Sequence, residues 1–175
     1  TGQSSCMKAT AGHYVDTNGS PSQTPCSPGT WQDQTGQASC MNATAGHYVD
    51  TNGSASQTPC SLGTYTPSNG SNSSVACMNA TAGHYVDTNG SAAQTPCAAG
   101  TYNPNSTLND STACLTTPAG NKSHPGDGSL TTSAPGTCKD PIGPSRCMNA
   151  TTSNYLDNHS ARYHPPTYPG PVDDN

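Results

Sequence analysis

The sequence repeats one cysteine-bounded segment almost letter for letter. CMNATAGHYVDTNGSASQTPC occupies 40–60, near-identical copies occupy 6–26 and 77–97, and a degraded copy begins at Cys147. The opening cysteine of the segment recurs after 34 residues (6 to 40) and then after 37 (40 to 77). Periods of this length are typical of arrays in which each unit packs against its neighbours. The sequence therefore predicts an elongated tandem array of cysteine-rich modules.

Each period contains two copies of a shorter half-repeat. AGHYVDTNGS at 45–54 matches LGTYTPSNGS at 62–71, which lies 17 residues later, in its Gly, Tyr and Asn-Gly-Ser positions. Alternating residues around Asn-Gly are a strong hairpin signal. We predict a small, mostly β or irregular fold in which each half-repeat is a β-hairpin with an Asn-Gly turn (52–53, 69–70 or 89–90) at its tip. An irregular disulfide loop is the alternative.

The composition does not provide a conventional hydrophobic core. Hydrophobic residues make up 29% of the 175 residues, with no Phe and a single Trp, whereas globular domains contain about 45–50%. Nine cysteines in such a chain indicate a disulfide framework made in an oxidising environment, so we expect an extracellular protein, secreted or at the cell surface. Metal ligation is a weaker alternative, because the sequence lacks Cys-x-x-Cys and Cys/His clusters of zinc type. The repeated methionines, Met7, Met41, Met78 and Met148, are expected to fill gaps beside the cystines.

Three segments repeat a cysteine, a glycine and an aromatic residue in fixed order. CSPGTW (26–31), CSLGTY (60–65) and CAAGTY (97–102) resemble ephrin-receptor-like repeats and, in style, the cysteine-rich modules of tumour-necrosis-factor receptors. The resemblance covers residues 1–117 well and 118–160 poorly. It implies that the cysteine before Gly-x-Tyr pairs with the cysteine that ends the same loop. The implied disulfides are Cys26–Cys40, Cys60–Cys77 and Cys97–Cys114, followed by Cys138–Cys147, with Cys6 left over.

The same resemblance implies that alternate half-repeats have lost a disulfide. The missing pairs correspond to Ala9 with Gln23, Ala43 with Gln57, and Ala80 with Gln94. Each surviving cystine should contribute about 3 kcal/mol by constraining the unfolded chain. A rival scheme pairs cysteines that are 20 residues apart, namely Cys6–Cys26, Cys40–Cys60 and Cys77–Cys97.

These features divide the chain into five segments. Residues 1–40, 41–77 and 78–114 are cysteine-rich repeats, 115–160 is a degenerate repeat, and 161–175 is a Pro-rich extended tail. Because the chain opens inside a repeat, we expect units to stack end to end in a fibril, with 164–175 lying against the next unit.

The clearest candidate sites are N-glycosylation acceptors. Asn-x-Ser/Thr occurs at 12 of the 15 asparagines, which far exceeds chance for this Ser and Thr content and indicates selection of glycan acceptors. The sequon before Pro21 is the weakest of them. The candidate acceptors are Asn18, Asn42, Asn52, Asn69, Asn72, Asn79, Asn89, Asn105, Asn109, Asn121, Asn149 and Asn158.

Other recurrent patterns carry less chemistry. His-Tyr-Val-Asp recurs three times, but residues i and i+3 of a strand face opposite ways, so a catalytic triad is not expected. Asp-Thr-Asn-Gly-Ser is a turn rather than a calcium loop, because it lacks further acidic ligands. The repeated tyrosines are expected to pack between units, with sugar stacking as the alternative. They are Tyr14, Tyr48, Tyr65, Tyr85 and Tyr102.

Together these patterns predict an extracellular structural glycoprotein and not an enzyme. The few basic residues do not cluster, so no nucleic-acid partner is expected, and no apolar run is long enough to insert into a membrane. We expect covalent glycans but no cofactor and no metal. The alternative is the ligand-binding ectodomain of a receptor or surface antigen, which a membrane anchor elsewhere in the full-length chain would favour.

Overall fold

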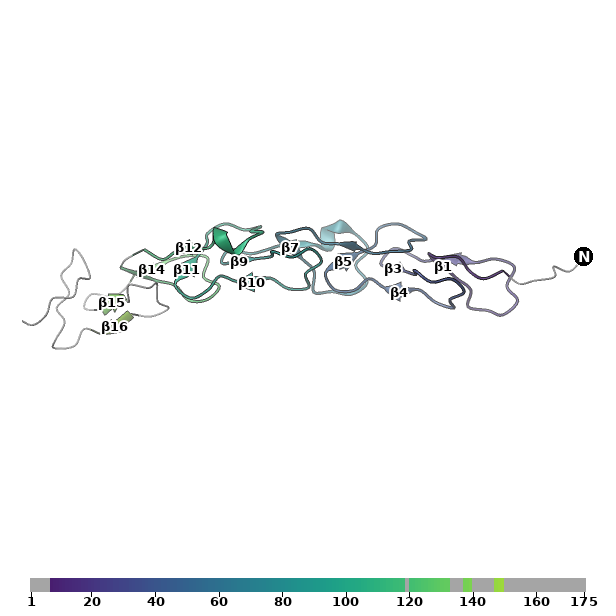
Figure 1. Ribbon diagram of the computed structural model, residues 1–175, viewed down its shortest axis with the longest axis horizontal. Helices are drawn as coiled ribbons and strands as arrows, with labels where there is room; N and C mark the ends of the chain where they lie inside the picture. Colours follow the sequence, from purple (N-terminus) through teal and green to yellow (C-terminus); the bar gives the residue numbers. More distant parts are fainter. Residues whose placement is uncertain (1–6, 119, 133–136, 140–146, 150–175) are drawn as a thin grey trace, which may run out of the picture.

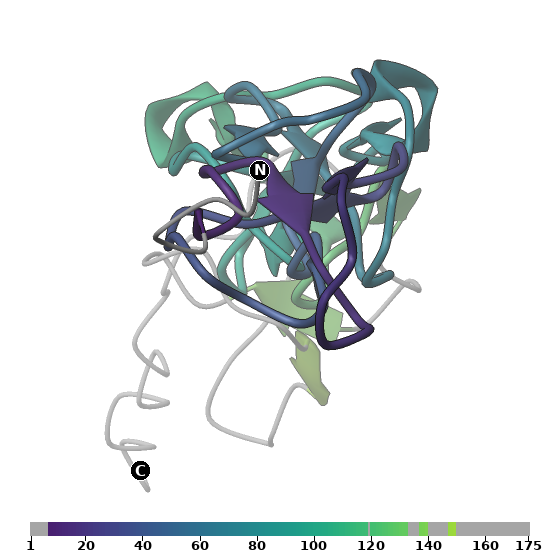
Figure 2. The ribbon, with the colours of Figure 1, turned by 90° about the vertical axis from the view of Figure 1, so that its right-hand side faces the viewer.

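The computed structural model describes residues 7–118, 120–132, 137–139 and 147–149, the last two ranges by their backbone alone. Within this part the chain is nearly all short strands and irregular structure. Figure 1 shows the described strands following one another along the long axis of an elongated body, and the view along that axis in Figure 2 shows them overlying one another. Cys6 and the tail 161–175 lie outside the described residues.

The strands form two-stranded antiparallel hairpins, each joining strands that are consecutive in the sequence. This pairing confirms the hairpin prediction. The hairpins are β1 (His13–Tyr14) with β2 (Thr24–Pro25), β3 (Thr30–Trp31) with β4 (Met41–Asn42), β5 (His47–Tyr48) with β6 (Thr58–Pro59), β7 (Thr64–Tyr65) with β8 (Met78–Asn79), β9 (His84–Tyr85) with β10 (Thr95–Pro96), β11 (Thr101–Tyr102) with β12 (Leu115–Thr116), β13 (Asn121–Lys122) with β14 (Thr131–Thr132), and β15 (Thr137–Lys139) with β16 (Cys147–Asn149). Two 3₁₀ turns, η1 (Ser74–Ala76) and η2 (Ser111–Ala113), precede β8 and β12.

The turn before each hairpin requires its glycine. In the β5–β6 hairpin, the backbone N–H of His47 donates to the carbonyl of Thr44 at 3.0 Å, and Gly46 between them has φ +86°. Side chains disfavour this left-handed backbone. The N–H of Cys60 then donates to the Gly46 carbonyl at 2.8 Å and closes the base of the hairpin. Gly-x-Tyr is thus a turn followed by a strand.

Consecutive hairpins are joined by a repeating set of backbone hydrogen bonds. Gly46 and Val49 of the β5–β6 hairpin donate to the carbonyls of Thr66 and Ser71 in the next hairpin, at 2.8 and 2.9 Å, and Gly70 donates back to Ala43 at 2.7 Å. Equivalent bonds join the other hairpins and supply the partners that short strands lack within their own hairpin. The donors equivalent to Gly46 are Gly12, Gly29, Gly63 and Gly83, whose acceptors are Gln32, Val49, Val86 and Asn103.

Alternate hairpins also touch through backbone. A Cβ built on Gly46 would lie 1.9 Å from the carbonyl oxygen of Gly90, which lies two hairpins further along the chain. The same contact joins Gly12 to Gly53, at 2.0 Å, and Gly83 to Gly126, at 2.1 Å. The Asn-Gly turns that we predicted as hairpin tips therefore lie in the hairpin loops but are docked on earlier hairpins.

The interior is a thin line of small side chains. The junction before each turn is filled alternately by alanine and cysteine, and Val49 and Val86 are buried beside it. The expected role of methionine is wrong, since Met7, Met41 and Met78 are 86%, 42% and 45% exposed. Small side chains leave no gap of methionine size beside the cystines. Buried junction residues are Ala9, Cys26, Ala43, Cys60, Ala80 and Cys97.

Candidate functional site

Three disulfides close alternate hairpins. They join Cys26 to Cys40, Cys60 to Cys77 and Cys97 to Cys114, with Cα–Cα distances of 5.7, 5.6 and 5.8 Å. These pairs confirm the connectivity that the family resemblance implied. The rival equal-spacing scheme is wrong, because each disulfide lies within one hairpin, where its cysteines directly precede or flank the paired strands. The side chains of Cys138 and Cys147 lie outside the described part, so their pairing stays a prediction.

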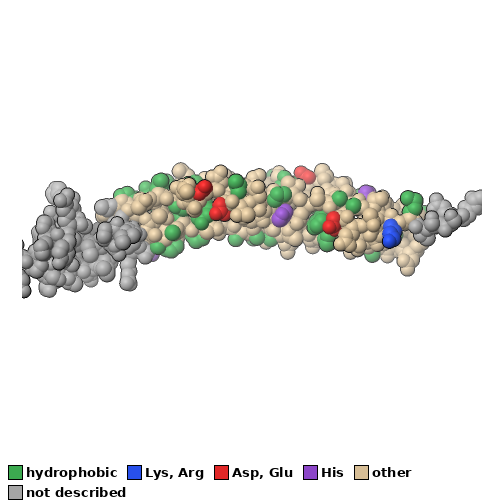
Figure 3. All heavy atoms as spheres, in the orientation of Figure 1, with side chains coloured by type: hydrophobic (Ala, Val, Ile, Leu, Met, Phe, Trp, Pro, Cys, Tyr) green, Lys and Arg blue, Asp and Glu red, His purple; other side chains and the backbone are tan. Residues whose placement is uncertain are grey.

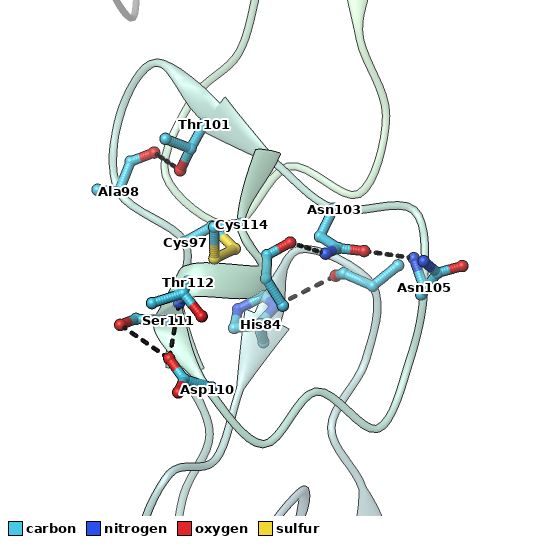
Figure 4. The surroundings of a disulfide bond; sticks show 12 residues. His84, Cys97, Ala98, Thr101, Asn103, Asn105, Asp110, Ser111, Thr112 and Cys114 are labelled. Atoms are coloured by element: carbon cyan, nitrogen blue, oxygen red, sulfur yellow. Dashed lines mark hydrogen bonds between the residues drawn. A yellow bond between two sulfur atoms is a disulfide. The ribbon is translucent and has the colours of Figure 1, made fainter. Parts of the chain in front are cut away.

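The surroundings of the third disulfide are polar (Figure 4). Asn103, which is 2% exposed, donates through Nδ2 to the Ala113 carbonyl and accepts the Asn105 N–H at 2.8 Å. Asp110 caps η2 by accepting the Thr112 N–H at 2.7 Å. That backbone hydrogen bond, followed by hydroxyl donation from Thr112 and Ser111, lowers the pKa of the exposed Asp110 carboxyl.

A glutamine side chain replaces the disulfide in the intervening hairpins. Gln57 accepts the backbone N–H of Thr44 through Oε1 at 2.8 Å and donates through Nε2 to the Thr44 hydroxyl at 2.9 Å. The same Thr–Gln clasp occurs at Thr10 with Gln23 and at Thr81 with Gln94. We had identified these positions as sites of lost cystines, but had not predicted that glutamine closes the same loop.

The repeated histidines belong to this packing. His47 Nδ1 lies 3.2 Å from the Thr44 hydroxyl and 3.3 Å from the Ala45 carbonyl. Its ring lies against the docked Asn-Gly turn two hairpins away, since a Cβ on Gly90 would be 3.0 Å from Cε1 of His47. Asp50, three residues further along, is exposed. The position of His47 is that of a packing residue, and the described residues contain no group of three or more His, Cys, Asp or Glu arranged to hold a metal ion.

The sequon asparagines are accessible wherever their side chains are described, and most are fully exposed. The non-sequon Asn103 is by contrast buried and hydrogen-bonded. Asn121 is half-buried, while Asn158 and the side chain of Asn149 lie outside the described part. Figure 3 shows a face dominated by neutral polar atoms with scattered charges. The exposed acceptors are Asn18, Asn42, Asn52, Asn69, Asn72, Asn79, Asn89, Asn105 and Asn109.

Two further observations bear on where and how the protein works. Its three disulfides are typical of proteins that fold in an oxidising environment. Among the described residues, no helix has the length and apolarity needed to cross a bilayer. In comparisons with known proteins, the chain matched no family model and no curated protein.

Proposed function

We propose that this protein is an extracellular structural glycoprotein whose hairpin repeats form the rod of a glycan-coated fibril or cell-surface coat. The observation that carries the proposal is the sorting of asparagines by exposure. Nine sequon asparagines are exposed, whereas Asn103, outside any sequon, is buried. Attached glycans need accessible acceptors, and this distribution supplies them along the described hairpins.

The contacts between hairpins support a mechanical role. Each hairpin is bonded to the next through its backbone, and alternate hairpins touch at glycines such as Gly46 and Gly90. Bending the array would break hydrogen bonds on one side and compress backbone contacts on the other. Three disulfides limit how far any hairpin can open. A rod of this kind keeps its length without a large hydrophobic core.

The β1–β2 hairpin supports end-to-end assembly with another copy. In later hairpins, the glycine of the Asn-Gly turn donates to the preceding hairpin, as Gly53 does to Cys26 at 2.8 Å. Neither the equivalent Gly19 N–H nor the Ser20 carbonyl has a backbone partner among the described residues. We propose that a hairpin of a second copy pairs with this edge through the bonds that join hairpins within the chain.

Electron microscopy and glycopeptide mapping of native protein test the proposal together. We expect filaments or a layered coat, and occupied glycans at the exposed sequons. Enzymatic deglycosylation in heavy-oxygen water marks formerly occupied asparagines by isotope, so they are distinguished from asparagines that deamidated spontaneously. Asn103 is the matched control and should be unmodified. Single particles with unmodified Asn42, Asn52, Asn79 and Asn89 would overturn the proposal.

A further inference from the structure

One pentapeptide occurs three times in nearly identical turns. Asp-Thr-Asn-Gly-Ser occupies 16–20, 50–54 and 87–91. Its asparagine is exposed each time, and the following glycines, Gly19, Gly53 and Gly90, have φ values of +79°, +71° and +76°. Because local sequence and backbone conformation are matched, a difference in reactivity between these turns must come from what surrounds them.

The surroundings of the three turns differ at the glycine nitrogen. The N–H of Gly53 donates to the carbonyl of Cys26, and that of Gly90 to the carbonyl of Cys60, both at 2.8 Å. Gly19 has no such acceptor in the described chain. Space differs in the same way, since a Cβ on Gly90 would lie 3.0 Å from the His47 ring but one on Gly19 would meet nothing within 4 Å.

We propose that Asn18 is a site of spontaneous succinimide formation and deamidation, and that hairpin stacking protects Asn52 and Asn89 from the same reaction. The backbone nitrogen of Gly19 attacks the side-chain Cγ of Asn18 and forms a new N–C bond. The Cγ–Nδ2 bond breaks, and the amide leaves as ammonia with the proton lost from the glycine nitrogen. Water then opens the five-membered imide at either carbonyl, giving aspartate or isoaspartate.

The stacked turns resist this reaction for two reasons. The glycine N–H must lose its proton, and in Gly53 and Gly90 that N–H is engaged with a carbonyl of an earlier hairpin. The asparagine must also swing its Cγ over the glycine nitrogen, and the docked turn resists that movement. Local opening has to come first in these two turns, and opening populates the reactive state only rarely.

The reaction has consequences for the glycan coat, although it does not depend on the proposed function. Conversion of Asn18 adds a negative charge and abolishes the acceptor of that sequon, while a glycan on Asn18 would block the reaction. Isoaspartate also lengthens the backbone within the turn. Deamidation and glycosylation at Asn18 are therefore mutually exclusive outcomes for one side chain.

The test uses the full 175-residue chain, made with its disulfides in a host that does not attach N-glycans and shown to be monomeric by light scattering. It is incubated at mildly alkaline pH, and aspartate and isoaspartate are quantified by peptide mass mapping. We expect Asn18 to convert about five- to thirtyfold faster than Asn52 and Asn89, the factor set by one or two hydrogen bonds that must first open.

Two controls separate fold from sequence. In reduced, denatured protein the three asparagines should convert at similar rates. In the folded Pro21→Ala variant, which gives the first turn the same following residue as the other two, Asn18 should remain the fastest. Equal rates for Asn18, Asn52 and Asn89 in folded protein would overturn the proposal, and so would a preference for Asn18 that persists after denaturation.

Discussion

Replacing Gly12 by alanine tests whether alternate hairpins really hold one another. Gly12 and Gly19 lie in the same hairpin with φ values of +80° and +79°. A Cβ on Gly12 would lie 2.0 Å from the Gly53 carbonyl oxygen, whereas one on Gly19 would have nothing within 4 Å. The two substitutions therefore share the same backbone strain, about 1–2 kcal/mol for a left-handed residue, and differ only in the contact with the second hairpin along.

The contact adds a calculable cost to Gly12→Ala. Moving the carbonyl oxygen from 2.0 to about 3.0 Å, the shortest separation that real Cβ atoms show, requires the hairpins to part by about 1 Å. A shift of that size breaks hydrogen bonds such as the 2.7 Å bond from Gly12 N–H to Gln32. With overpacking costing about 1–3 kcal/mol and each lost bond about 1 kcal/mol, Gly12→Ala should be about 2–3 kcal/mol less stable than Gly19→Ala.

Denaturant unfolding followed by the fluorescence of Trp31, the single tryptophan, measures the difference. Trp31 lies in β3, next to Gln32, which accepts the Gly12 bond. At equal slopes, the shift in midpoint reports the change in stability. Equal midpoints for the two variants would refute the idea that glycine contacts between alternate hairpins stabilise the array.

Three further predictions concern single hairpins. The double substitution Ala43→Cys/Gln57→Cys should form a disulfide equivalent to Cys26–Cys40, with a sequence separation of 14 in both cases (57 − 43 and 40 − 26), and should stabilise by about 3 kcal/mol, as measured by thermal unfolding with and without reductant. Gln57→Ala alone should destabilise by about 1–2 kcal/mol in the same assay, because the Thr44 N–H loses its acceptor. Because the pKa of Asp110 is lowered in the folded state, its cap on η2 should persist above its ordinary pKa of 3.8 and be lost at lower pH; amide exchange of the capped N–H in wild type and in Asp110→Asn, whose cap should not titrate, checks this.

The sequence predicted the hairpins and their cross-links because both are local. Half-repeats aligned at Gly-x-Tyr locate the turn before each strand, and the family resemblance supplied the pairing of Cys60 with Cys77. Both features join residues within one half-repeat, and each is encoded by a short segment such as Leu62–Tyr65. The register of one hairpin therefore needed no knowledge of the others.

Contacts between hairpins could not be predicted in this way. The alignment shows that Gly46 and Gly90 recur, but not that their backbones meet, because repeat identity makes every copy equivalent and leaves the choice of partner open. The Asn-Gly turns were accordingly predicted as hairpin tips, whereas Gly53 and Gly90 are docked on earlier hairpins. The alternation of alanine and cysteine at the junction, as in Ala43 and Cys60, was the available signal that this position is buried.

The docking of each hairpin on its neighbours explains how half the cystines could be replaced by glutamine. The clasped β5–β6 hairpin lies between the β3–β4 and β7–β8 hairpins, both closed by disulfides. To open, it must break its Thr44–Gln57 clasp and also the bonds that Gly46 and Val49 make to the next hairpin and Gly53 makes to the previous one. Its neighbours cannot yield far, because their loops are covalently closed. A clasp of modest strength is then sufficient within the array, although it would not hold the same hairpin in isolation.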